Sequence, residues 1–135
     1  MPERTARNIL FICMGNICRS PMAEGVFLHK LRSQGLDAEY KVDSAGTGGW
    51  HAGDPPDPRS DDVARANGVP LVSRARQVTT EDFSRFDLLV CMDEENARNL
   101  AAMGCPESKI VQLMYDLIDG ALDRLLARMR GNDSA

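Results

Sequence analysis

The sequence of 135 residues lacks an excess of positive charge, a long apolar run and any low-complexity segment. Its formal net charge is −4, whereas a general nucleic-acid-binding protein would carry a basic face or tail, so no nucleic-acid partner is expected. No apolar stretch reaches the length of a membrane span, and residues 9–13 are too few for the apolar part of a signal peptide. We therefore expect no membrane partner and a cytoplasmic location.

Patterns typical of metal sites and disulfide frameworks are also missing. The sequence has no Cys-x-x-Cys pair, and its two histidines, His29 and His51, stand alone, so neither a metal nor another cofactor is expected. An even number of cysteines can indicate disulfides, but this chain is not a small, loop-rich secreted domain. We expect free thiols, at least one of them reactive, at Cys13, Cys18, Cys91 and Cys105.

Strand and helix patterns alternate along the chain, which at this length is expected to form one domain over residues 1–135. Strands are expected at 8–12, 40–42, 87–92 and 109–113. Helices are expected to begin near Ser20, Pro58, Thr79 and Asp93, and the last, from about Tyr115, has Ile118, Ala121, Leu122, Leu125 and Met129 on one face. This alternation predicts an α/β fold, an open four-stranded parallel sheet with helices on both faces.

The loop at residues 13–20, Cys-Met-Gly-Asn-Ile-Cys-Arg-Ser, follows the first strand and leads into a helix. Backbone N–H groups at a helix N-terminus bind anions, and a guanidinium at Arg19 can hold two phosphate oxygens. The same positive surroundings favour the thiolate of Cys13 over its thiol. Cys-x5-Arg alone occurs by chance, and a cysteine ending a buried strand is usually inert. Its position between strand and helix, at the edge where such sheets bind ligands, favours a phosphate-binding loop with a nucleophile.

Several segments together resemble the low-molecular-weight protein tyrosine phosphatases. The first covers residues 9–24 and is highly specific; the others are residues 43–47, 50–51, 56–59, 75–77 and 91–94, so the likeness extends over most of the chain. The resemblance implies a four-stranded parallel sheet with flanking helices. It also implies hydrolysis of phosphotyrosine proteins or small aryl phosphates through a phosphocysteine intermediate.

The resemblance assigns roles to particular residues. It implies that Cys13 attacks phosphorus, that Arg19 binds phosphate and stabilises the transition state, and that Ser20 donates a hydrogen bond to the thiolate. Asn16 and Ser44 would hold the loop in shape, and Cys18 would form a reversible disulfide with Cys13. Trp50 would wall the cleft for the aromatic ring. The phosphate-binding residues would be Met14, Gly15, Asn16, Ile17, Cys18 and Arg19. By contrast, we expect His51 to be structural, Cys91 to be strand core and Cys105 to be a loop residue of no consequence.

One part of the family pattern is absent. The family takes the leaving-group proton from an Asp-Pro-Tyr segment between the fourth strand and the last helix, whereas here Met114 is followed directly by Tyr115. Either the natural chain lost this loop, or residues are missing between Met114 and Tyr115 in the sequence as written; the intact remainder of the chemistry favours the second. Asp116 belongs to the helix pattern and is not assigned as an acid.

Two other functions stay open from the sequence. An arsenate reductase can share this loop but needs closely spaced relay cysteines, and Cys91 and Cys105 are 14 positions apart. The second alternative is a phosphotyrosine-binding module that no longer hydrolyses its ligand. Activity on p-nitrophenyl phosphate, whose leaving group needs little protonation, separates an enzyme from a binding module.

Overall fold

The structure is a computed structural model that describes residues 7–16, 19–49, 51–66, 68–69, 71, 74–112, 122 and 124–127. For Arg19 the description covers the backbone alone.

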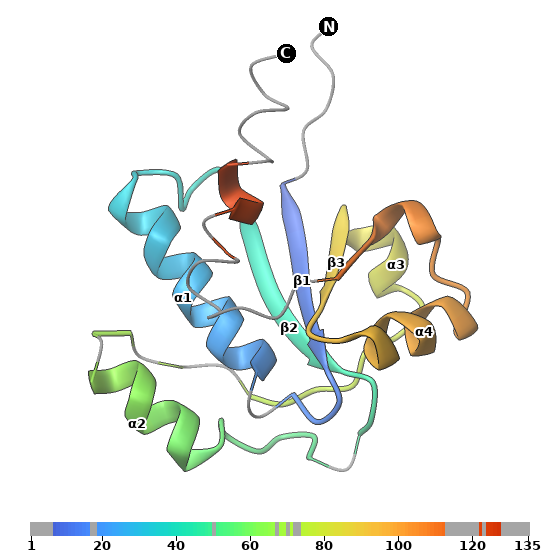
Figure 1. The fold of residues 1–135 in the computed structure, drawn as a ribbon, viewed down its shortest axis with the longest axis horizontal. Coiled ribbons are helices and arrows are strands. Elements are labelled where there is room, and N and C mark those ends of the chain that lie inside the picture. Colours follow the sequence, from blue (N-terminus) through green and yellow to red (C-terminus); the bar gives the residue numbers. More distant parts are fainter. Residues whose placement is uncertain are drawn as a thin grey trace, which may run out of the picture.

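Four parallel strands form the sheet. They are β1 (Asn8–Cys13), β2 (Lys41–Gly46), β3 (Leu88–Cys91) and β4 (Ile110–Gln112), in the order β2-β1-β3-β4. β1 pairs with β2 on one side and β3 on the other, and β4 pairs with β3 (Figure 1). This confirms the predicted open, parallel, four-stranded sheet.

The two faces of the sheet carry separate apolar clusters because successive residues of a strand point to opposite sides. Ile9 and Phe11 face α1 (Arg19–Ser33), where Phe27 meets the ring of Phe11 edge-on at 5.6 Å, and the helical residues Leu122, Leu125 and Leu126 complete this cluster. Leu10 and Ile12 face α3 (Asp82–Arg85) and α4 (Glu94–Ala102). Figure 1 shows α1 on one side of the sheet and α3 and α4 on the other.

Helix ends follow the capping residues in the sequence. Asp57 accepts a hydrogen bond from the Arg59 N–H at 2.9 Å at the start of α2 (Pro58–Ala66), and Asp93 accepts one from the Asn96 N–H at 2.9 Å at the start of α4. The chain leaves α1, α2 and α4 through glycines with positive φ, at Gly35, Gly68 and Gly104. The starts of α2 and α4 agree with those predicted at Pro58 and Asp93, and α1 begins at Arg19, one residue before the predicted Ser20.

Several boundary predictions were wrong, and the third strand covers residues 88–91 rather than the predicted 87–92. Tyr40 lies before β2, which instead extends through Ser44 to Gly46, because pairing with the whole of β1 continues past the apolar residues. α3 begins at Asp82 rather than at Thr79. Lys109 was predicted in the fourth strand but ends a short 3₁₀ turn, Glu107–Lys109, where its Nζ donates to the Phe83 carbonyl at 2.7 Å.

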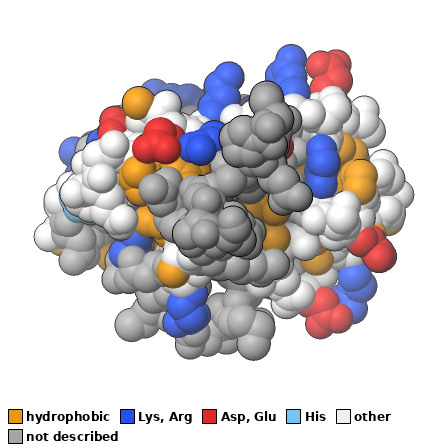
Figure 2. All heavy atoms as spheres, turned by 90° about the horizontal axis from the view of Figure 1, so that it is seen from above, with side chains coloured by type: hydrophobic (Ala, Val, Ile, Leu, Met, Phe, Trp, Pro, Cys, Tyr) orange, Lys and Arg blue, Asp and Glu red, His pale blue; other side chains and the backbone are white. Residues whose placement is uncertain are grey.

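The described helices include none that combines the length and the apolar character needed to cross a membrane. Figure 2 views the molecule from the end of the sheet opposite the β1–α1 loop, and there Lys and Arg side chains are interspersed with Asp and Glu. The visible part of this face therefore carries no continuous region of one charge sign.

Candidate active site

The loop after β1 begins at the carboxyl end of a central strand. From β1 the chain crosses to β2 on one side, whereas from β3 it crosses to β4 on the other. Opposite crossovers from neighbouring strands leave a crevice at their carboxyl ends, which is the usual ligand site of such sheets. Cys13, the last residue of β1, lies at this position, and the 15-residue helix α1 begins at Arg19 just beyond the loop (Figure 1).

Two polar groups contact the thiol of Cys13. Its side chain is buried, yet its Sγ lies 2.9 Å from the Ser20 Oγ and accepts a hydrogen bond from the Asn16 N–H at 3.2 Å. The Ser20 Oγ itself accepts from the Asn16 Nδ2 at 2.8 Å, which leaves the hydroxyl hydrogen of Ser20 free to point at sulfur. Two donors directed at one buried sulfur stabilise negative charge there.

Asn16 fixes the shape of the loop. It is buried and is the one non-glycine residue with positive φ among the described residues, at 57°, a conformation that asparagine tolerates better than most side chains. Its Nδ2 donates to the Ser20 Oγ and to the Ser44 Oγ at 2.9 Å, and its Oδ1 accepts from the Arg76 N–H at 2.9 Å. The amide therefore joins the loop to α1, β2 and the segment at residues 75–78.

Ser44 extends this network to the first helix. Its hydroxyl accepts from Asn16 and donates to the Glu24 Oε1 at 2.6 Å. Both Ser44 and Glu24 are buried, and a buried carboxylate is tolerated where it accepts hydrogen bonds. Sequence reasoning included Ser44 but gave Glu24 no role, because a carboxylate one turn into a helix looks like any solvated surface residue.

Arg76 supports the loop from the far side of β2. Its guanidinium makes two hydrogen bonds to the carboxylate of Asp82, at 3.0 and 3.1 Å, and a third to Asp43 at 3.2 Å. Burial alone would raise the pKa of Asp82, but the bonds from Arg76 and from the Thr79 N–H outweigh it and lower that pKa. Burial likewise opposes the charge of Arg76, yet Asp82 and Asp43 raise its pKa. The ion pair holds in place the backbone N–H that binds Asn16.

The loop also approaches β2 closely. The Thr47 N–H donates to the Cys13 carbonyl at 3.0 Å and the Gly48 N–H donates to the Met14 carbonyl at 2.9 Å. A Cβ on Gly46 would lie 2.7 Å from the Met14 carbonyl oxygen and 3.1 Å from the Asn16 nitrogen. Since both neighbours are backbone atoms, only glycine fits there without moving the loop.

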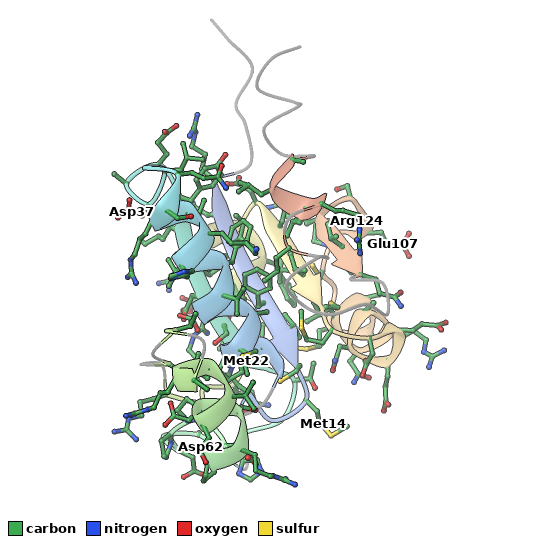
Figure 3. The ribbon with its side chains drawn as sticks, turned by 60° about the vertical axis from the view of Figure 1, so that its left-hand side comes forward. Met14, Met22, Asp37, Asp62, Glu107 and Arg124 are labelled. Atoms are coloured by element: carbon green, nitrogen blue, oxygen red, sulfur yellow. The ribbon has the colours of Figure 1, made fainter. Side chains whose placement is uncertain are left out.

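Of the remaining predicted site residues, Met14 and Gly15 lie in the described loop. The side chain of Met14 projects outward beyond the sheet (Figure 3). Ile17, Cys18 and Trp50 lie outside the described residues, as does the side chain of Arg19. Met114, Tyr115 and Asp116, at the predicted break in the family pattern, also lie outside them, with Ile118, Ala121 and Met129 of the last helix. Among the described residues, His, Cys, Asp and Glu side chains form no group of three that could hold a metal.

Residues 8–126 match the family described as low molecular weight phosphotyrosine protein phosphatase. The chain belongs to this family. It is 46% identical to the human low molecular weight phosphotyrosine protein phosphatase over 100 residues, which are 74% of this chain and 63% of the relative. It is 40% identical to the Bacillus subtilis protein-tyrosine-phosphatase YfkJ over 114 residues, 83% of this chain and 73% of that one. The alignment thus spans less than two thirds of the mammalian relative.

Solved structures of the same family agree with the fold. The crystal structure of YfkJ superposes with a TM-score of 0.88 at 33% identity, covering 96% of this chain and 98% of that chain. A protein tyrosine phosphatase from Entamoeba histolytica superposes with a TM-score of 0.87 at 28% identity, covering 93% and 98%. The predicted family and its sheet architecture are therefore confirmed.

The two cysteines outside the loop belong to the core. Cys91 is fully buried in β3, as predicted, and burial raises the pKa of its thiol to about 12. Cys105 lies in the loop after α4, as predicted, and is buried in the same cluster, where burial raises the pKa of its thiol too. The turn at Gly104 brings the Cys105 N–H back to the Leu100 carbonyl at 3.0 Å. Two buried thiols do not suit the mobile relay that an arsenate reductase needs.

Proposed function

We propose that this member of the family hydrolyses phosphotyrosine or aryl phosphates through a phosphocysteine intermediate at Cys13. The observation that carries the proposal is the buried sulfur of Cys13, with Ser20 Oγ at 2.9 Å and the Asn16 N–H at 3.2 Å, at the end of β1. An inert core cysteine has no need of two polar groups. A nucleophile that must carry negative charge does.

In the first step the thiolate of Cys13 attacks phosphorus. The P–S bond forms as the bond from phosphorus to the aryl oxygen breaks, and the leaving oxygen takes the electron pair and a proton. The phosphoryl oxygens would be held by backbone N–H groups of Met14, Gly15, Asn16, Ile17, Cys18 and Arg19. The guanidinium of Arg19 would bind two of these oxygens and stabilise the transition state.

In the second step water attacks phosphorus and the P–S bond breaks, which releases inorganic phosphate and returns the thiolate. Cys13 is now the leaving group, so the hydrogen bond from Ser20 that stabilises its negative charge lowers this barrier. The side chains of Asn16 and Ser44 act as positioning groups, since Asn16 Nδ2 donates to Ser20 and to Ser44 and neither side chain is assigned to the substrate. Trp50 would wall the cleft, and Cys18 would protect Cys13 from irreversible oxidation through a disulfide.

The proton for the leaving group is assigned to no residue here, because the position of the family's acid lies between Met114 and Tyr115. If residues are missing there from the sequence as written, the intact protein weighs clearly more than 14.8 kDa, and rates on aryl phosphates depend weakly on leaving-group pKa. If the sequence is complete, the mass agrees and rates fall steeply with more basic leaving groups. A matching mass with fast phosphotyrosine turnover would contradict both versions.

Trapping the intermediate tests the mechanism directly. Acid quenching during p-nitrophenyl phosphate turnover should leave a phosphoryl group on the peptide that contains Cys13, detected by mass spectrometry. In parallel, Arg19→Lys should keep the charge and lose about 10²-fold in kcat/KM, because lysine cannot bind two oxygens through a planar fork. Turnover with no phosphorylated Cys13 peptide would exclude the covalent mechanism, and no turnover with tight phosphotyrosine binding would indicate a binding module.

The remaining parts of the proposal concern substrate and compartment. The partner is a phosphotyrosine protein or a small aryl phosphate, with no nucleic acid or membrane involved. The proposed compartment is the cytoplasm, where a reducing environment keeps the reactive thiol of Cys13 free. Localising a tagged protein in its own cell checks the compartment, and trapping its redox state by rapid alkylation checks that the thiol of Cys13 is free.

A further inference from the structure

A shallow groove opens next to the loop that carries Cys13, on the side of the sheet covered by α4. Its walls come from three parts of the chain: Met14 of the loop, Thr47 and Gly48 after β2, and Glu95, Asn99 and Met103 along α4 and its end. The backbone bonds from Thr47 to Cys13 and from Gly48 to Met14 join one wall of the groove to the loop itself. A group bound in the groove would therefore be held at a fixed position relative to Cys13, the proposed nucleophile.

Two exposed methionines line this groove. Met14 is 46% exposed and Met103 is 37% exposed, and Val63 on α2 is the other large apolar side chain exposed among the described residues. Scattered exposed apolar residues are ordinary, but two that converge on one groove beside a ligand loop indicate a contact surface. Methionine is flexible and polarizable, so it adapts to partners of different shape.

The carboxylate of Glu95 lines the same groove. Glu95 is exposed, and no ion pair joins it to another described residue, whereas its neighbour Glu94 pairs with Arg98 at 3.3 Å. The helix α4 has no basic residue in its last turn, so nothing on the helix beyond Arg98 balances this charge. Among the described residues, the groove thus combines an apolar lining with a carboxylate that has no ion-pair partner.

We propose that this groove binds a lysine or arginine side chain of the substrate, one or two residues from the phosphotyrosine. The methylene stem would lie on Met14 and Met103 while the cationic group meets Glu95, which is how long basic side chains commonly bury their apolar part. Consecutive Cα atoms are about 3.8 Å apart, so the side chain of a residue one or two positions from the phosphotyrosine can reach the groove while the phosphate lies in the loop. The inference rests on the proposed function, because it names the sequence class of that function's substrate.

The test is a binding series that does not depend on turnover. Fluorescently labelled phosphotyrosine peptides, otherwise of alanine, carry lysine, norleucine or glutamate at positions −2, −1, +1 or +2, and their Kd for the Cys13→Ser protein is measured by anisotropy. At one of these positions lysine should bind about fivefold more tightly than glutamate, the size expected for exposed charges, with uncharged norleucine in between.

Two variants separate the charge from the apolar contact. Glu95→Gln should reduce the preference for lysine over glutamate to less than about twofold. Glu107→Gln removes the same charge from the 3₁₀ turn, where Glu107 (labelled in Figure 3) does not line the groove, and should leave the preference unchanged. Met103→Ala should weaken lysine and norleucine peptides by about two- to threefold without affecting the alanine peptide.

Other results overturn the inference. The inference is contradicted if the peptides bind equally at all four positions, if glutamate is preferred, or if norleucine binds better than lysine. It is also contradicted if Glu95→Gln keeps the full preference for lysine. Hydrolysis of p-nitrophenyl phosphate by the unmodified protein is measured separately. If that hydrolysis is absent, the proposed function fails; if it is present and the peptide series is flat, only the groove assignment fails.

Discussion

Cys13 and Cys91 end neighbouring strands of the same sheet, and the residue before Cys13, Ile12, pairs in register with Cys91. Both side chains are buried, with Cys13 4% exposed and Cys91 fully enclosed. Their surroundings differ in polarity. Cys13 faces Ser20 Oγ and the Asn16 N–H, whereas Cys91 lies among apolar residues on the opposite face, where burial raises its pKa to about 12.

Burial therefore does not decide what a cysteine can do in this protein. Removing a thiol from water penalises its charged form, and hydrogen-bond donors or positive charge placed near the sulfur oppose that penalty. A shift of one position in register turns a side chain at the end of a strand to the other face of the sheet. On one face the side chain meets the start of α1 and a polar loop; on the other it meets Leu100 and Cys105.

The largest expected contrast between the two cysteines is their reaction with iodoacetamide in the native protein. With a pKa of about 12, Cys91 is about one part in 10⁵ thiolate at pH 7, and it is also enclosed, so it should stay unmodified. Cys13 should be alkylated first, and phosphate or vanadate should slow that reaction. Peptide mapping over time measures both. Equal labelling of Cys91 and Cys13 without unfolding would remove the distinction drawn here.

Substitution should separate the same two residues by activity. Cys13→Ser should lower kcat/KM on p-nitrophenyl phosphate by about 10³-fold or more while vanadate still binds, because the nucleophile is lost and the loop is kept. Cys91→Ala should keep its activity and lose about 1–2 kcal/mol of unfolding free energy to a small cavity. Residual activity of Cys13→Ser above about 1% of wild type, with contamination excluded, would count against the nucleophile assignment.

Disturbing the loop without touching the thiol should give a smaller effect. Asn16→Ala removes three side-chain hydrogen bonds and leaves a residue that disfavours a φ of 57°, so kcat should fall by about 10²-fold, the cost of misplacing a catalytic group by about 1 Å. Asn16→Gly loses the same three hydrogen bonds, but glycine adopts this φ readily, so the kcat of this variant should fall less. If glycine and alanine were equally impaired, the backbone conformation would contribute nothing.

Asp82 should affect stability rather than the chemistry of either cysteine; it is 2% exposed and pairs with the roughly one-third exposed Arg76. Asp82→Asn should cost about 2 kcal/mol at pH 7, less than a fully enclosed ion pair would. Because folding lowers the pKa of Asp82, its stabilisation is present above the unfolded value of about 3.9 and is lost as pH falls through the folded value. The difference in Tm between wild type and variant should therefore shrink below about pH 4.

The exposed Asp62 on α2, labelled in Figure 3, provides the matched control for this series. Asp62→Asn should change Tm by less than about 1 °C across the same pH range, because an exposed carboxylate is well solvated in both states. A constant difference between wild type and Asp82→Asn from pH 7 to pH 3 would contradict an electrostatic role for Asp82.

Much of the fold could be predicted because local signals agreed with the tertiary structure. Asp57 and Asp93 cap helices, and Gly35, Gly68 and Gly104 end them, each through backbone geometry that a short stretch of sequence determines. Predictions of strand boundaries failed where contacts with distant parts of the chain, rather than the local sequence, decided them. The polar residues Asp43 and Ser44 are in β2 because β1 lies alongside them, and Lys109 leaves its strand to reach the Phe83 carbonyl.

The sequence by itself determined the candidate loop, since Cys13, Asn16, Arg19 and Ser20 lie within eight residues and their types already indicate an anion site with a nucleophile. It also determined the parallel sheet through its alternating apolar runs. Only the tertiary structure decided which further distant groups hold the loop: Glu24, which accepts a hydrogen bond from Ser44, on one side, and Arg76 with Asp82 on the other. The physical reason is that hydrogen bonds between segments depend on how helices and strands pack, and no local pattern records that packing.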